Sequence, residues 1–88
     1  MKRKSGFIVR EIAGKTVAVA VGSASKDFHG IISLNSTGLF IWNLLENETS
    51  EENIVENLLK TYDVDKEKAA SDVKNTLEIL KNAGIIVE

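Results

Sequence analysis

The stretch Leu34-Asn35-Ser36-Thr37-Gly38-Leu39-Phe40-Ile41-Trp42-Asn43-Leu44-Leu45 decides the fold, because it closes a short apolar run and opens a helix in one step. The residues at 35–37 all suit a helix start, since their side-chain oxygens can accept the free N–H groups of a first turn. Six of the seven residues at 39–45 are apolar, including the only tryptophan. A helix that is apolar almost all round must be buried, so we expect this junction at the centre of the fold.

Length and composition limit the possible classes of protein. The chain has 88 residues, 43% of them hydrophobic, which suits one domain over residues 1–88. It has no cysteine, so disulfides, thiolate nucleophiles and cysteine zinc sites are excluded. The net charge of −2 offers no strong basic field for a polyanion.

The first residues resemble the start of a signal peptide but lack what should follow. Lys2, Arg3 and Lys4 precede no apolar segment with a cleavage site, and we expect them to form a solvated, frayed terminus. The longest apolar run, at residues 17–21, is too short to span a membrane. We therefore expect a cytoplasmic protein with no membrane contact.

The first third of the chain predicts three strands. Residues 7–12 and 16–21 are rich in β-branched side chains and flank Gly14, which can supply the positive φ of a turn. Strands this close in sequence should pair as an antiparallel hairpin. A polar loop then leads to a third strand at about residues 28–34.

The rest of the chain predicts three helices. The first should span residues 36–46. Thr49 and Glu52 form a capping-box pattern that predicts the start of the second helix. That helix carries an apolar stripe at helical spacing, which consists of Ile54, Val55, Leu58, Leu59 and Tyr62.

Asp65 is a plausible cap for the third helix, and Gly84 occupies the usual position after a helix end. Residues 85–88 form a short apolar tail that could be a final strand or a wing. The predicted fold class is α+β, a small three-stranded antiparallel sheet followed by three helices, similar to a winged helix-turn-helix.

Catalytic and metal-binding patterns are missing from the sequence. His29 is the only histidine, and Ser33 would lie over about 10 Å away along a strand, so no catalytic triad is expected. The acidic run from residue 63 resembles a calcium loop only at first, because Lys68 and Lys74 replace its glycine and its final glutamate. No phosphate-binding loop occurs. We expect no catalytic residue, no metal and no cofactor.

The helix order also permits a winged-helix DNA-binding or regulatory module. A recognition helix should present basic and amide side chains to the groove, but the third helix mixes lysines with acidic residues and has no arginine. We therefore expect no nucleic-acid partner and keep this module as the alternative function. A third possibility is self-association through an exposed sheet edge, with a monomer and a domain-swapped dimer both open.

Three features in order resemble the PqqD family, the RiPP recognition elements that serve peptide-modifying enzymes. The resemblance covers residues 7–87. Its motifs are the junction Gly30-Ile31-Ile32-Ser33-Leu34-Asn35-Ser36-Thr37-Gly38-Leu39-Phe40-Ile41-Trp42-Asn43-Leu44-Leu45, the segment Thr49-Ser50-Glu51-Glu52-Asn53-Ile54-Val55 with Leu58, Leu59 and Tyr62-Asp63-Val64-Asp65, and Asp72-Val73 with Leu77, Leu80 and Gly84-Ile85-Ile86.

The resemblance implies a protein that binds the leader peptide of a ribosomally made precursor and presents it to a modifying enzyme, often a radical S-adenosylmethionine enzyme. It also implies that the peptide lies along the third strand and in the groove beside the third helix. Family members are sometimes fused to enzymes; here we expect the domain to meet its enzyme in trans. Prolines common in the family are replaced by Ala20 and Lys66, which affects local turns.

An exposed strand edge can bind a peptide by strand addition, and residues 30–34 are the candidate edge. Alternation should send Ile32 and Leu34 to one face and Ile31 and Ser33 to the other. The third helix has an apolar stripe centred on Ala69, Val73 and Leu80. Asp72, Thr76 and Ile79 lie along its border, where a groove wall could form. The expected peptide-binding residues are Gly30, Ile31, Ile32, Ser33, Leu34, Asp72, Thr76 and Ile79.

Overall fold

A hairpin begins the main sheet in the computed structural model, which describes residues 1–22 and 30–87. Strands β2 (Phe7–Ile12) and β3 (Lys15–Ala20) pair antiparallel around Ala13 and Gly14. These two residues have φ values of 52° and 79°, and left-handed values at both positions match the twist of a two-residue hairpin. The predicted hairpin is confirmed, with β3 shifted one residue toward the N-terminus.

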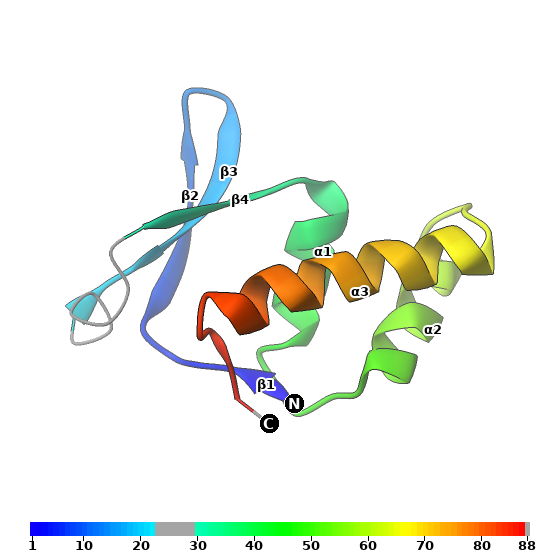
Figure 1. The fold of residues 1–88 in the computed structure, drawn as a ribbon. Helices are drawn as coiled ribbons and strands as arrows, with labels where there is room; N and C mark the ends of the chain where they lie inside the picture. Colours follow the sequence, from blue (N-terminus) through cyan, green and yellow to red (C-terminus); the bar gives the residue numbers. More distant parts are fainter. Residues whose placement is uncertain (23–29, 88) are drawn as a thin grey trace.

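Strand β4 (Ile31–Leu34) pairs antiparallel with β3, so that the sheet order is β2-β3-β4 (Figure 1). Gly30 forms a bend before it. The predicted strand start at Phe28, and His29, lie outside the described residues. The third strand is confirmed for residues 31–34, and it forms an edge of this sheet.

Helix α1 (Ser36–Leu44) follows β4 after a single residue, Asn35. Asn35 is the N-cap, and its side chain accepts a hydrogen bond from the Gly38 N–H at 2.7 Å. Trp42 is 1% exposed, so the predicted central position of this helix is confirmed. The helix ends at Leu44, two residues before the expected end.

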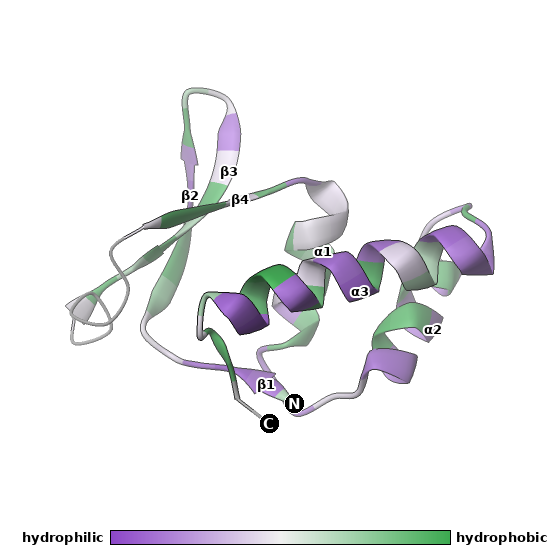
Figure 2. Ribbon diagram, in the orientation of Figure 1, coloured by the Kyte–Doolittle hydropathy of each residue, from purple (hydrophilic) through white to green (hydrophobic). Residues whose placement is uncertain are grey.

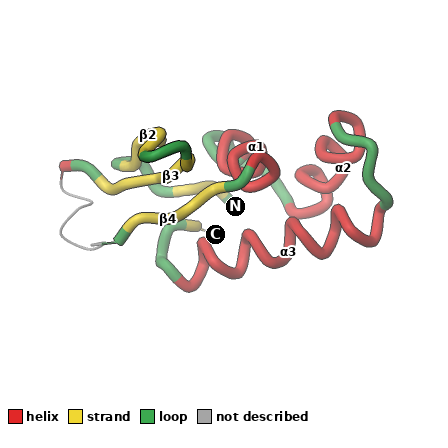
Figure 3. Tube along the Cα trace, turned by 90° about the horizontal axis from the view of Figure 1, so that it is seen from above, coloured by secondary structure: helices red, strands yellow, loops and turns green. Residues whose placement is uncertain are grey.

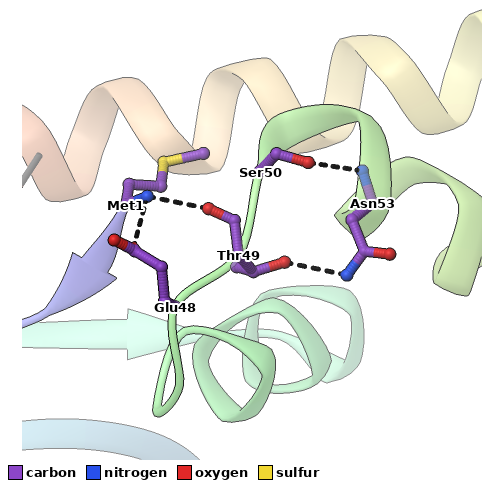
Figure 4. Close-up of polar contacts among 5 residues, drawn as sticks. All are labelled: Met1, Glu48, Thr49, Ser50 and Asn53. Carbon is purple, nitrogen blue, oxygen red and sulfur yellow. Dashed lines mark hydrogen bonds and ion pairs between the residues drawn. The ribbon is translucent and has the colours of Figure 1, made fainter.

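Helices α2 (Glu51–Thr61) and α3 (Lys66–Asn82) complete the helical layer. The cap of α2 is Ser50, which accepts a hydrogen bond from the Asn53 N–H at 3.1 Å. The prediction of Thr49 was wrong, because backbone bonds to Met1 hold Thr49 one residue outside the helix. The Thr49 hydroxyl instead accepts from the Asn53 side chain at 2.9 Å (Figure 4).

Both ends of α3 form as predicted. The Asp65 side chain accepts a hydrogen bond from the Lys68 N–H at 2.7 Å. At the other end, Gly84 has a φ of 75°. Its N–H donates to the Lys81 carbonyl, and the Ile85 N–H donates to the Leu80 carbonyl. These two bonds form a Schellman motif, in which glycine takes the left-handed position without steric cost.

The N-terminal segment is ordered, contrary to the expected frayed terminus. Strand β1 (Lys2–Arg3) pairs antiparallel with β5 (Ile86–Val87) in a second, two-stranded sheet. The Arg3 N–H donates to the Leu45 carbonyl at 2.9 Å, and Arg3 Nε donates to the Trp42 carbonyl at 3.1 Å. Strands β1 and β5, from opposite ends of the described chain, therefore lie side by side (Figure 1).

One core joins the sheet to the helices. Helices α2 and α3 alternate hydrophilic and hydrophobic residues along their length (Figure 2), and their apolar stripes face inward. Viewed from above, β4 lies beside the C-terminal half of α3 (Figure 3). The buried core cluster contains Ala18, Leu34, Ile41, Trp42, Leu45, Ile54, Leu58, Ala69, Val73, Leu77, Leu80 and Ile85.

Candidate functional site

The free edge of β4 exposes backbone groups at alternate residues. The Val21 N–H donates to the Gly6 carbonyl at 2.8 Å, which fixes which pairs in the β2–β3 ladder are hydrogen-bonded. By alternation, Val19 directs its backbone groups to β2, and Ala18 directs its own to β4. Ile32, opposite Ala18, is thus bonded within the sheet. The N–H and C=O groups of the neighbouring residues, Ile31 and Ser33, point to the open side.

The side chains of β4 alternate as predicted. Leu34 is 8% exposed and belongs to the core, and Ile32 is partly buried against it. Ile31 is 61% exposed, and Ser33 is also exposed. The strand therefore presents one apolar face to the helices and keeps its backbone edge free.

A groove lies between this strand and α3. It is lined by β4, the helix junction and the C-terminal half of α3, and it measures about 120 Å³. Small-molecule pockets typically measure roughly 300–1,000 Å³, so this groove suits one or two side chains of an extended chain. Its lining residues are Ile32, Ser33, Leu34, Asn35, Gly38, Thr76, Ile79 and Leu80.

Five of the predicted site residues meet in this groove: Ile32, Ser33, Leu34, Thr76 and Ile79. The other three are not in its lining. Gly30 and Ile31 continue the strand edge. Asp72 lies about one turn before Thr76 on α3, and its carboxylate is 3.4 Å from the Lys68 ammonium.

Sequence reasoning did not include Asn35, Gly38 and Leu80 in the groove. A Cβ on Gly38 would lie 3.1 Å from Asn35 Oδ1 and 3.5 Å from Leu34 Cδ2. Glycine therefore lets the first turn of α1 approach the strand end closely. The signal in the sequence was the glycine three residues after the cap, at a position where other residues favour a helix more strongly.

The chemistry available in the groove is backbone pairing and apolar contact. None of its lining side chains is titratable. Ile79 is 59% exposed, an unusual position for a large aliphatic side chain on a helix that already has a buried stripe. A ligand bound here would gain hydrogen bonds from the β4 edge and cover this side chain.

Other kinds of site have little support in the described residues. Within residues 1–22 and 30–87, no three or more His, Asp or Glu side chains form a group that could hold a metal ion. Among these residues, no helix is both long and apolar enough to cross a membrane. In the described part of the chain, the pKa of Glu48 is lowered by a hydrogen bond from the Met1 ammonium and by the charge of that group.

The fold and groove define a small α+β domain with an open strand beside a helix, a form suited to peptide recognition. The family described as coenzyme PQQ synthesis protein D (PqqD) matches residues 15–86, and the chain belongs to this family. No curated protein matches it in sequence.

Two solved structures share the fold over nearly the whole chain. One is TbiB1 in complex with the TbiA(beta) leader peptide, at a TM-score of 0.71 and 25% identity, with 97% of this chain and 93% of that chain covered. The other is lasso peptide synthetase B1 complexed with the leader peptide, also at 0.71, with 20% identity and 99% and 96% coverage. The predicted resemblance to the family is confirmed.

Proposed function

We propose that this protein binds the leader segment of a ribosomally synthesised precursor peptide and presents it to a modifying enzyme. The observation that carries the proposal is the free edge of β4 directly beside an apolar groove. A chain that pairs with Ile31 and Ser33 places alternate side chains over the groove. Family membership and two relatives that are leader-peptide complexes support the same role.

The energetics suit reversible binding. Each backbone hydrogen bond contributes about 0.5–1.5 kcal/mol net, so the edge groups of two residues give useful but limited affinity. Apolar contact with Ile32, Thr76 and Ile79 adds to it and selects which side chain enters the groove. The protein contributes recognition, and the chemistry belongs to the partner enzyme.

Neither structural relative is described as a nucleic-acid complex. On α3, Lys68 is paired with Asp72. The DNA-binding alternative thus gains no support, and we propose the peptide as the ligand.

Amide hydrogen exchange and ¹H–¹⁵N NMR would test the proposal directly. The probe is the leader segment of a precursor peptide encoded in the same gene cluster, with unrelated duplex DNA as the control. We expect shifts at residues 30–34 and 76–79 with peptide alone. The amides of Ile31 and Ser33 should gain protection, while that of Ile32, already bonded to β3, should change little.

Uniform protection along β4, or shifts confined to the lysines of α3 with DNA, would contradict the proposal. Gel filtration of the free protein is the control for self-association. A dimer formed through the β4 edge would protect the same amides in the absence of peptide.

A further inference from the structure

The main sheet has a second face, which is turned away from the helices. Direct cross-strand pairing places Ile8, Val19 and Ile31 side by side on this face. Two further aliphatic residues, Ile12 and Val17, share it by alternation. We call this surface of the sheet the outer face. These aliphatic residues hold five of its eight strand positions, and the other three hold Arg10, Lys15 and Ser33.

This face is unevenly exposed, because Val17 at its centre is 3% exposed, and Ile8 and Val19 are half-buried. None of the five aliphatic residues belongs to the core cluster or packs against it. Ile12 is 51% exposed and Ile31 is 61% exposed. Ile8, Val19 and Ile31 form one apolar row across the three strands, and exposed apolar surface marks interaction sites. The next row, which contains Arg10 and the buried Val17, separates it from Ile12.

The charges around the outer face have one sign. Arg10 and Lys15 lie on it, whereas Glu11, the acidic residue of the hairpin, alternates to the opposite face. Among residues 1–22 and 30–87, neither basic side chain forms an ion pair. Two basic residues among the aliphatic ones, on a chain of net charge −2, favour a partner that offers carboxylates beside its apolar contacts.

The outer face is also continuous with the proposed peptide site. Ile31 belongs to both, because its side chain lies on the outer face and its backbone groups point to the open edge. A peptide strand added at β4 would turn every second side chain toward the outer face and enlarge it. A protein docked there would touch the bound peptide as well as the sheet.

We propose that the outer face is the docking surface for the modifying enzyme, which meets it with apolar residues and nearby carboxylates of its own. Bound leader peptide completes this docking surface. This inference rests on the proposed function. A second copy of the chain is a poorer occupant, since a two-fold axis would oppose the basic residues of the two copies. The enzyme should therefore bind the peptide-loaded protein more tightly than the free protein.

The test uses the full chain, a leader peptide and a purified peptide-modifying enzyme from the same gene cluster. Two outer-face variants are the double change Arg10→Glu with Lys15→Glu, and Ile12→Ser. The matched control is Lys66→Glu with Lys74→Glu, which alters the net charge equally at exposed positions of α3. Leader affinity and enzyme affinity are measured separately, the second at low and high salt.

We expect both outer-face variants to keep leader affinity within about twofold and to lose enzyme affinity by about tenfold or more. The charge variant should also flatten the salt dependence, and the control should behave as the wild type. Unchanged enzyme affinity in both outer-face variants would overturn the inference while leaving the proposed function intact. If the wild-type protein does not bind the leader peptide, the proposed function itself is wrong. If the protein forms a concentration-dependent dimer that Ile12→Ser abolishes, the partner at the outer face is a second copy of the chain and not the enzyme.

Discussion

The side chain of Asn35 accepts a hydrogen bond from the Gly38 N–H at 2.7 Å, and both residues line the groove beside β4. One contact thus starts α1 and shapes the floor of the proposed peptide site. Helix capping and the shape of the groove are therefore linked at this point, because a shift of the cap moves two residues of the groove lining.

Replacing Asn35 with alanine should lower the free energy of unfolding by about 1 kcal/mol, the typical cost of losing an N-cap side chain. Urea unfolding measures the change. Asn35→Asp retains an acceptor oxygen and is the control, so it should stay close to the wild type. Equal losses in the two variants would show that the cap bond contributes little.

Proline at position 33 should separate folding from peptide binding. The Ser33 N–H points to the open edge, and edge positions tolerate proline. Ser33→Pro should therefore fold but bind the leader peptide about tenfold more weakly, because one donor is removed and the edge is blocked. Isothermal titration calorimetry gives the affinity, and circular dichroism checks the fold.

Two substitutions control for this result. Ser33→Ala keeps the N–H and should bind nearly as the wild type does. Ile32→Pro removes an N–H that bonds to β3 and should destabilise the fold instead. Wild-type affinity in a folded Ser33→Pro variant would argue against strand addition at β4.

The groove residue Ile79 should matter for binding and hardly for stability. It is 59% exposed, so Ile79→Ser should change the free energy of unfolding by no more than about 0.5 kcal/mol. Leader affinity should fall by about five- to tenfold through lost apolar contact. Ile12→Ser, at 51% exposure on the outer face, is the matched control and should retain leader affinity.

The sequence was a good guide to the fold where local chemistry and burial agree. The Asn35 cap, the buried Trp42 and the glycine end of α3 each follow from side-chain type and spacing. The alternation of β4 was equally readable, because one face of the strand had to enter the core. Membership of the PqqD family followed from the same motifs.

The contacts that sequence reasoning missed are long-range. Arg3 looked like a solvated basic residue, since nothing nearby in the chain indicates that it reaches Trp42, 39 positions away. The same holds for Met1, which bonds to Thr49 and so moves the α2 cap to Ser50. Leu80 serves both the core and the groove, and helical periodicity detects only the first role.

The contact of Arg3 with Trp42 joins the N-terminal segment to the core. Its guanidinium carbon lies 4.8 Å from the centre of the Trp42 ring, and Nε donates to the Trp42 carbonyl. Arg3→Ala should lower the free energy of unfolding by about 1–2 kcal/mol. Arg3→Lys should recover only part of this, since an ammonium lacks the planar, directed guanidinium donors. Full recovery by lysine would reduce the contact to simple charge attraction.

Glu48 should make stability depend on pH at the acidic end. Its carboxylate lies 2.7 Å from the Met1 ammonium (Figure 4), and the hydrogen bond and charge of that group lower its pKa below the ordinary 4.5. A carboxyl whose pKa is lower in the folded state stabilises the fold above its unfolded pKa, and this contribution is lost as the pH falls through the folded value. Glu48→Gln should therefore be less stable than the wild type at about pH 7 and equal to it at about pH 2, where both carry a neutral side chain. Because Glu48 is exposed, the difference should shrink in high salt.

Thermal unfolding of the wild type and Glu48→Gln between about pH 2 and pH 7 measures the difference in stability. The control is Glu46→Gln. A difference that persists unchanged at about pH 2 would assign the effect to packing of the side chain and not to its charge.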